Sequence, residues 1–103
     1  MPKSYRVKIT RSAEEDIEDI YDYVHRDSPQ VALAFIDELE SQISSLEHFP
    51  LRCPTIPEST DEMSFPYRHL IYGEYRTIFR VEGRTVYILR VIHGARLLSL
   101  DIL

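Results

Sequence analysis

Residues 75–93 read YRTIFRVEGRTVYILRVIH, two runs of β-branched and aromatic residues on either side of Glu82-Gly83. Such runs, joined by a two-residue turn that contains glycine, predict an antiparallel β-hairpin. A second glycine, Gly73, separates this hairpin from a shorter apolar run that begins at Tyr67. The last third of the chain, residues 67–96, therefore predicts a three-stranded antiparallel meander.

The turn position also predicts which residues share a face. A turn at Glu82-Gly83 places Val81 opposite Arg84 and Phe79 opposite Val86. One face would then pack against helices, and it carries Tyr75, Thr77, Phe79, Val81, Val86, Ile88 and Ile92. Arg90 also falls on that face, a placement that a β-bulge would relieve.

The opposite face of the predicted sheet mixes arginines with apolar residues. It carries Arg76, Ile78, Arg80, Tyr87, Leu89, Val91 and His93. Small monomers rarely leave an apolar patch open to water, so we expect Ile78, Leu89 and Val91 to be covered by a partner chain or by the apolar tail Leu97 to Leu103.

The first half of the chain predicts a strand and two helices. Alternation in residues 5–10 predicts a short strand, and Ser12 with Glu15 matches a capping box at the start of an amphipathic helix. Ser28 and Pro29 open a second amphipathic helix, which Phe49-Pro50 ends. Two residues separate the helices, so they should pair as an antiparallel hairpin. The segment 51–65 is rich in proline and polar residues and predicts an irregular loop that is mobile or contacts a partner.

These elements predict an α+β fold: an N-terminal strand, an antiparallel α-hairpin and the meander, forming one sheet with helices on one face. The 103 residues suit a single domain spanning 1–103. No apolar run approaches the ~20 residues of a membrane span, and no leader pattern is visible, so we expect a cytoplasmic protein without a membrane partner. The lone Cys53 and four scattered histidines predict neither a metal site nor a cofactor.

Charge divides along the chain. Residues 63–100 hold six arginines against two glutamates, whereas residues 14–62 hold fourteen acids against two arginines. The formal net charge is −5. A basic sheet and acidic helices suggest separate faces for separate partners.

Three segments carry a resemblance to a known family. The order of elements, together with YRTIFRVEG at 75–83, VYILRVIHGAR at 86–96 and YRVKITRSAEEDI at 5–17, resembles the RelE/ParE toxin superfamily of type II toxin-antitoxin modules. The likeness spans nearly the whole chain. It implies one of two activities: RelE-like toxins cleave mRNA in the ribosomal A site, and ParE-like toxins are associated with inhibition of DNA gyrase.

The two branches differ in the residues that they require. RNA cleavage through the 2′-hydroxyl needs proton transfer and cations for the phosphate charge. By resemblance, the candidates for a metal-independent endoribonuclease are Arg76, Arg80, His93 and Arg96. Arg76 is equally well explained as a structural arginine paired with a carboxylate. His93 is better explained as a hydrogen-bonded residue at a strand end than as a catalyst.

Two departures favour the ParE-like branch. No lysine follows Lys8, and the ending His93-Gly94-Ala95-Arg96 resembles ParE toxins. We therefore expect a toxin that binds a target such as DNA gyrase and is not an enzyme. A ribosome-dependent endoribonuclease is the first alternative. A non-toxic member that only binds its antitoxin is the second, because the chain is acidic for a ribosome-binding toxin.

The resemblance also implies a protein partner. A cognate antitoxin would wrap the chain with a C-terminal segment that is disordered until bound, placing acidic residues on the sheet arginines. The predicted contacts for antitoxin or target are Arg76, Ile78, Arg80, Tyr87, Leu89, Val91, His93 and Arg96. DNA binding in such modules usually belongs to the antitoxin, so none is expected of this chain.

Overall fold

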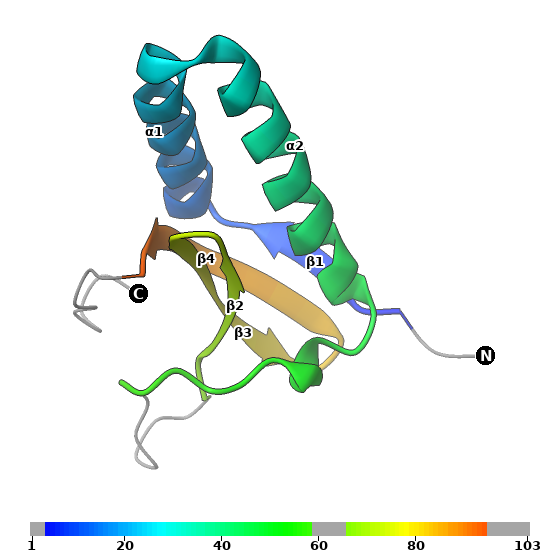
Figure 1. The fold of residues 1–103 in the computed structure, drawn as a ribbon. Coiled ribbons are helices and arrows are strands. Elements are labelled where there is room, and N and C mark those ends of the chain that lie inside the picture. The colour runs from blue at the N-terminus through cyan, green and yellow to red at the C-terminus, as the bar shows by residue number, and fades with distance from the viewer. Residues whose placement is uncertain (1–3, 59–65, 95–103) are drawn as a thin grey trace.

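A computed structural model describes residues 4–58 and 66–94. The elements run β1 (Arg6–Ile9), α1 (Arg11–Asp27), α2 (Pro29–Ser44), two 3₁₀ turns (Ser45–Glu47 and Pro50–Arg52), β2 (Arg68–Tyr72), β3 (Tyr75–Glu82) and β4 (Thr85–His93). The four strands form one mixed sheet in the order β1-β4-β3-β2, with β1 parallel to β4 and the other pairs antiparallel. Figure 1 shows the two helices on one side of this sheet. The predicted α+β fold is confirmed.

The helical hairpin forms for local reasons that the sequence shows almost completely. Ser28 caps α2 by accepting a hydrogen bond from the backbone N–H of Val31, and Pro29 occupies the first turn, as predicted. The predicted cap at Ser12 is wrong. Thr10 caps α1 instead, and its hydroxyl donates to the carbonyl of Ile88 at 2.7 Å, which fastens the helix start to β4. A cap that also bonds the sheet is favoured over one that does not.

The β3–β4 hairpin has a register two residues away from the predicted one. Val81 pairs with Val86, and Glu82 pairs with Thr85, so the turn is Gly83-Arg84. Gly83 has φ 59°, and no other residue of this turn has positive φ. A two-residue turn that needs a left-handed first position places glycine there, whereas the predicted turn would have required positive φ at Glu82.

A bulge changes the faces of β4 beyond the turn. The register shifts between Ile78 and Phe79, which places Val91 in the core under the helices and Ile92 on the other face. The predicted faces of Val91 and Ile92 were therefore wrong, although the bulge expected near Arg90 is present. An extra residue in one strand exchanges the faces of every residue after it.

The carboxylate of Asp16 in α1 hydrogen-bonds to the edge of β4 beyond the point where β1 ends. β1 ends at Ile9, opposite Ile88, and leaves the next backbone groups of β4 without a strand partner on that side. The carboxylate of Asp16 accepts from the backbone N–H of Val91 at 2.9 Å and from the Arg90 guanidinium at 2.6 and 2.9 Å. The helix therefore satisfies a strand edge that would otherwise be open.

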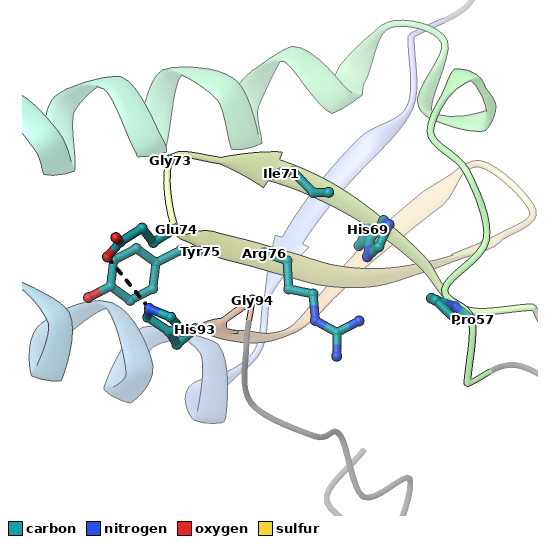
Figure 2. Close-up of a pocket in the computed structure, with 9 residues that line it drawn as sticks. All are labelled: Pro57, His69, Ile71, Gly73, Glu74, Tyr75, Arg76, His93 and Gly94. Carbon is teal, nitrogen blue, oxygen red and sulfur yellow. Dashed lines mark ion pairs between the residues drawn. The ribbon is translucent and has the colours of Figure 1, made fainter.

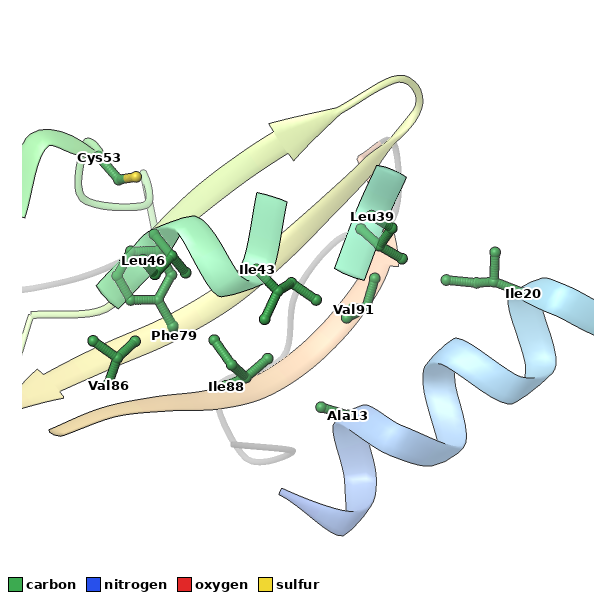
Figure 3. Close-up of a cluster of buried hydrophobic side chains, with 10 residues drawn as sticks. All are labelled: Ala13, Ile20, Leu39, Ile43, Leu46, Cys53, Phe79, Val86, Ile88 and Val91. Atoms are coloured by element: carbon green, nitrogen blue, oxygen red, sulfur yellow. The ribbon is translucent and has the colours of Figure 1, made fainter. Parts of the chain in front are cut away.

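The main core lies between the helices and the sheet (Figure 3). Its buried members are Ala13, Ile20, Leu39, Ile43, Leu46, Cys53, Phe79, Val86, Ile88 and Val91. They come from both helices, the turn after them and the two central strands. Burial raises the pKa of the Cys53 thiol, which keeps it protonated.

The second face of the sheet is closed by the segment that follows the helices. Ile56 packs with Ile78 and Ile92, and Tyr67 covers the same cluster. Backbone bonds hold the segment in place: Ile56 donates to Tyr67 at 2.9 Å, and His69 donates to Pro54 at 3.2 Å. Apart from the 3₁₀ turn Pro50–Arg52 and an isolated bridge between Thr55 and Arg68, residues 51–58 form no helix or strand, as the predicted irregular loop requires, although these bonds fix them against the sheet. The rest of the predicted loop, 59–65, lies outside the described residues.

The predicted open apolar patch does not exist. Ile78 is 0% exposed, Leu89 9% and Val91 2%. Ile78 is sealed by the 50–58 segment, and the bulge moves Val91 to the helix face. The tail Leu97 to Leu103, the other predicted cover, lies outside the described residues.

Candidate binding site

Two adjoining hollows lie where β2, β3 and the end of β4 meet α1. The first, here called the groove, has a volume of about 400 Å³ and is lined by Pro57, His69, Ile71, Gly73, Glu74, Tyr75, Arg76, His93 and Gly94 (Figure 2). The second, here called the α1 pocket, has a volume of about 310 Å³ and is lined by Asp19, Ile20, Tyr23, Glu74, Tyr75 and His93. The two share Glu74, Tyr75 and His93.

The shared wall is built at the turn between β2 and β3. The backbone N–H of Gly94 donates to the carbonyl of Glu74 at 2.6 Å, which ties the end of β4 to this turn. A Cβ atom at position 94 would lie 3.3 Å from that carbonyl oxygen, so a side chain there would crowd the bond. Glycine after His93 therefore allows the close approach that fixes the wall.

His93 and Tyr75 stand side by side on this wall. The Nε2 atom of His93 lies 3.5 Å from a carboxylate oxygen of Glu74, and the ring meets Tyr75 edge to face with centroids 5.6 Å apart. The ring of Phe35 in α2 also meets Tyr75 edge to face, with centroids 5.5 Å apart. Burial, followed by the nearby Tyr23 and Glu74, raises the pKa of the Tyr75 phenol, so this group stays neutral.

Arg76 lies in the groove but is already bound. Its guanidinium makes two hydrogen bonds to the carboxylate of Glu58, at 3.1 and 2.6 Å, and the residue is 7% exposed. Figure 2 shows this side chain pointing away from the strand, between His93 and His69. Burial, and then the charge of Arg76, lowers the pKa of His69, although Glu58 opposes the shift. The groove therefore contains a paired arginine and a neutral histidine.

A comparison with protein families settles what kind of protein this is. The model of the ParE toxin of the type II toxin-antitoxin system parDE matches residues 7–98, which include both helices and all of the four described strands except Arg6, the first residue of β1. The chain belongs to the ParE toxin family. Among curated proteins, none matches the chain in sequence.

Solved structures with the same fold come from toxin-antitoxin complexes. A chain of the chromosomal ParDE system from P. aeruginosa is 26% identical, with a TM-score of 0.69, and the alignment covers 88% of this chain and 97% of that one. A chain of the RelBE2 complex from Mycobacterium tuberculosis is also 26% identical, with a TM-score of 0.57 and coverage of 90% and 94%. A chain of the archaeal RelE-RelB complex from Pyrococcus horikoshii OT3 is 21% identical, with a TM-score of 0.62 and coverage of 91% and 99%, a likeness of fold alone.

The candidate residues from the sequence do not all lie at one site in this ParE-family fold. Arg76 and His93 line the groove together. Arg80 lines neither hollow; its guanidinium lies 5.0 Å from the ring centroid of Tyr87 and 3.7 Å from Glu82. Ile78, Leu89 and Val91 are buried, and Arg96 lies outside the described residues.

Several residues of the site were not predicted from the sequence. Glu58 binds Arg76. The groove or the α1 pocket is also lined by four residues that were not candidates: Tyr23, Ile71, Glu74 and Tyr75. Glu58 was not a candidate either. Only the position of Glu74 beside a turn glycine carried a local signal. In the described part of the chain, no cluster of histidine, cysteine and acidic residues is arranged to hold a metal, and no helix has the length and apolar character of a membrane span.

Proposed function

We propose that this ParE-family chain is a cytoplasmic toxin that arrests growth by binding a target such as DNA gyrase, and that a cognate antitoxin neutralises it. The observation that carries the proposal is the pairing of Arg76 with Glu58, which uses the arginine expected at a phosphate-binding position. The ParE family match supports the same branch, and so does the fold comparison, because the TM-score is 0.69 for the ParDE chain and 0.57 for the RelBE2 chain at equal sequence identity.

The arrangement of charges argues against a nuclease. Stabilising a phosphorane needs cations aimed at the reacting phosphate. Arg76 is bound by Glu58, and Arg80 stands four residues further along β3, roughly 13 Å away at the rise of a strand. The sheet contains a lysine only in β1, at Lys8. The candidate set is therefore not gathered around one phosphate in the described residues.

The groove is the surface that we propose for the antitoxin. The similar structures named above are toxin-antitoxin complexes, so an antitoxin is the expected partner. With the second face closed by Ile56, Ile71 is an apolar side chain of the groove that stays open, and it is 62% exposed. A segment that becomes ordered on binding gains free energy when it buries such an apolar side chain at the edge strand β2.

Supercoiling by purified DNA gyrase tests the proposed target. Excess antitoxin-free chain should inhibit supercoiling in a saturable way, and adding the protein encoded beside it should restore the activity. Heat-unfolded chain is the control. Full gyrase activity at a large excess of folded chain would remove gyrase as the target.

A ribosome-dependent endoribonuclease is the second candidate, because the groove does bring Arg76 and His93 together. It predicts codon-positioned mRNA cuts in a translating extract. Those cuts should disappear in His93→Ala, whose side chain is half exposed and not part of the core. Intact mRNA at a saturating concentration of the chain would exclude this activity. Normal growth on induction without antitoxin would instead favour a non-toxic member.

A further inference from the structure

The α1 pocket has a composition unlike that of the groove beside it. Two carboxylates, of Asp19 and Glu74, and two phenol rings, of Tyr23 and Tyr75, line it together with Ile20 and His93. No arginine or lysine lines it. Acidic groups beside aromatic faces are the surroundings that proteins use to hold an organic cation.

The fold sets these four groups around one space. Asp19 and Tyr23 are four residues apart on α1, so their side chains lie on one face of the helix. Glu74 and Tyr75 follow each other where β3 begins, and Tyr75 is held by its contacts with Phe35 and His93. The helix and the strand end therefore contribute one carboxylate and one ring each.

The neighbouring acids differ in whether a basic side chain already holds them. Asp16 is bound by Arg90, and Glu15 is bound by Arg11. The side chain of Glu74 is 81% exposed, and one of its carboxylate oxygens lies 3.5 Å from the imidazole Nε2 of His93. The rings of Tyr75 and Tyr23 supply apolar contact beside these charges.

We propose that the α1 pocket binds the side chain of an arginine in the incoming antitoxin segment. A guanidinium can stack on a phenol ring while donating paired hydrogen bonds to a carboxylate, which an ammonium does less well. The partner would therefore present an apolar residue to Ile71 in the groove and a basic residue to the α1 pocket. The identity of the partner rests on the proposed function, but binding of the cation does not.

A peptide titration followed by NMR tests this site on the full chain. The probe is Ac-Gly-Arg-Gly-NH₂, and its matched control carries citrulline, which has the same shape without the charge. We expect saturable shifts at Tyr23, Glu74 and Tyr75 and an affinity about fivefold or more above that of the citrulline peptide. Glu74→Gln and Asp19→Asn should each weaken binding about two- to fivefold.

A second acidic cluster supplies the matched protein control. Glu14, Glu15 and Glu18 line a hollow on α1 with Arg11 and no aromatic ring. Glu14→Gln should therefore leave the affinity for the arginine peptide unchanged. Thermal melts of each variant establish that the fold is intact, which is expected because the substituted carboxylates are exposed.

The outcomes separate this proposal from the proposed function. Equal binding of the arginine and citrulline peptides, or equal loss in Glu14→Gln and Glu74→Gln, would overturn the pocket while leaving growth arrest and gyrase inhibition untouched. A chain that binds the arginine peptide at this pocket but does not arrest growth would keep the cation site and refute the toxin assignment.

Discussion

Asp16→Ala is the substitution with the largest expected effect on stability outside the hydrophobic core. Asp16 accepts three hydrogen bonds, two from Arg90 and one from the backbone N–H of Val91. The Arg90 and Asp16 side chains are only 17% and 13% exposed. Removing the carboxylate leaves a largely buried guanidinium and a strand-edge N–H without their acceptor.

The cost follows from this burial. Breaking a buried ion pair by removing one partner costs about 3–5 kcal/mol, and water can still reach part of this guanidinium, so we expect about 3 kcal/mol. For a domain of this size that corresponds to a fall in Tm of roughly 12 °C or more. Asp16→Asn keeps an acceptor for the backbone N–H of Val91 but removes the charge, so it should lower the unfolding free energy by roughly half as much.

Chemical denaturation with circular dichroism measures the effect, and Glu15→Ala is the matched control. Glu15 lies next to Asp16 on α1 and also pairs with an arginine, but that pair is 91% and 62% exposed. Its loss should cost no more than about 0.5 kcal/mol. A loss below about 1 kcal/mol for Asp16→Ala, or one equal to that of Glu15→Ala, would refute the proposed joining of α1 to β4.

Three further predictions test other parts of the structure. Glu58→Ala should destabilise the chain by about 1–3 kcal/mol because it removes a carboxylate that accepts two hydrogen bonds from the buried Arg76, whereas Glu82→Ala, at a pair that is 33% and 46% exposed, should cost below about 1 kcal/mol. Equal losses measured by urea unfolding would contradict this. Phe49 has φ 52° and is 70% exposed, so Phe49→Gly should raise the unfolding free energy by about 0.5–1 kcal/mol relative to Phe49→Ala, and no difference in urea melts would count against strain there. The lowered pKa of His69 means that the unfolded chain takes up a proton first as pH falls below about 6.5, so Tm should fall from pH 6.5 downward and His69→Gln should flatten that fall; an unchanged slope would show that His69 does not contribute.

The elements were predictable from local sequence, whereas the strand register was not. Alternation and glycine positions are enough to predict β3 and β4, but one glycine between Glu82 and Arg84 permits two turns. The two registers differ by two residues, which keeps each side chain on the same face, so the hydrophobic pattern cannot distinguish them. The awkward placement of Arg90 indicated a bulge, but the pattern could not show its effect on Val91 and Ile92, because both are β-branched and apolar and fit either face.

The closed second face depended on contacts between distant residues. Ile56 lies in a proline-rich stretch whose composition indicated an irregular loop, and its pairing with Tyr67 brings it over Ile78. The bond between Glu58 and Arg76 likewise joins residues eighteen positions apart. Neither pairing has a local signature, which is why the sequence did not predict the cover over Ile78 or name Glu58 as the carboxylate that binds Arg76.

Growth arrest without RNA cleavage is the central claim, and one induction experiment tests it. The chain is expressed without its antitoxin, growth is followed, and the 5′ ends of cellular mRNA are mapped in the same culture. We expect arrest with mRNA ends that match those of uninduced cells. Arrest accompanied by new ends at fixed codon positions, absent from a His93→Ala culture, would contradict it.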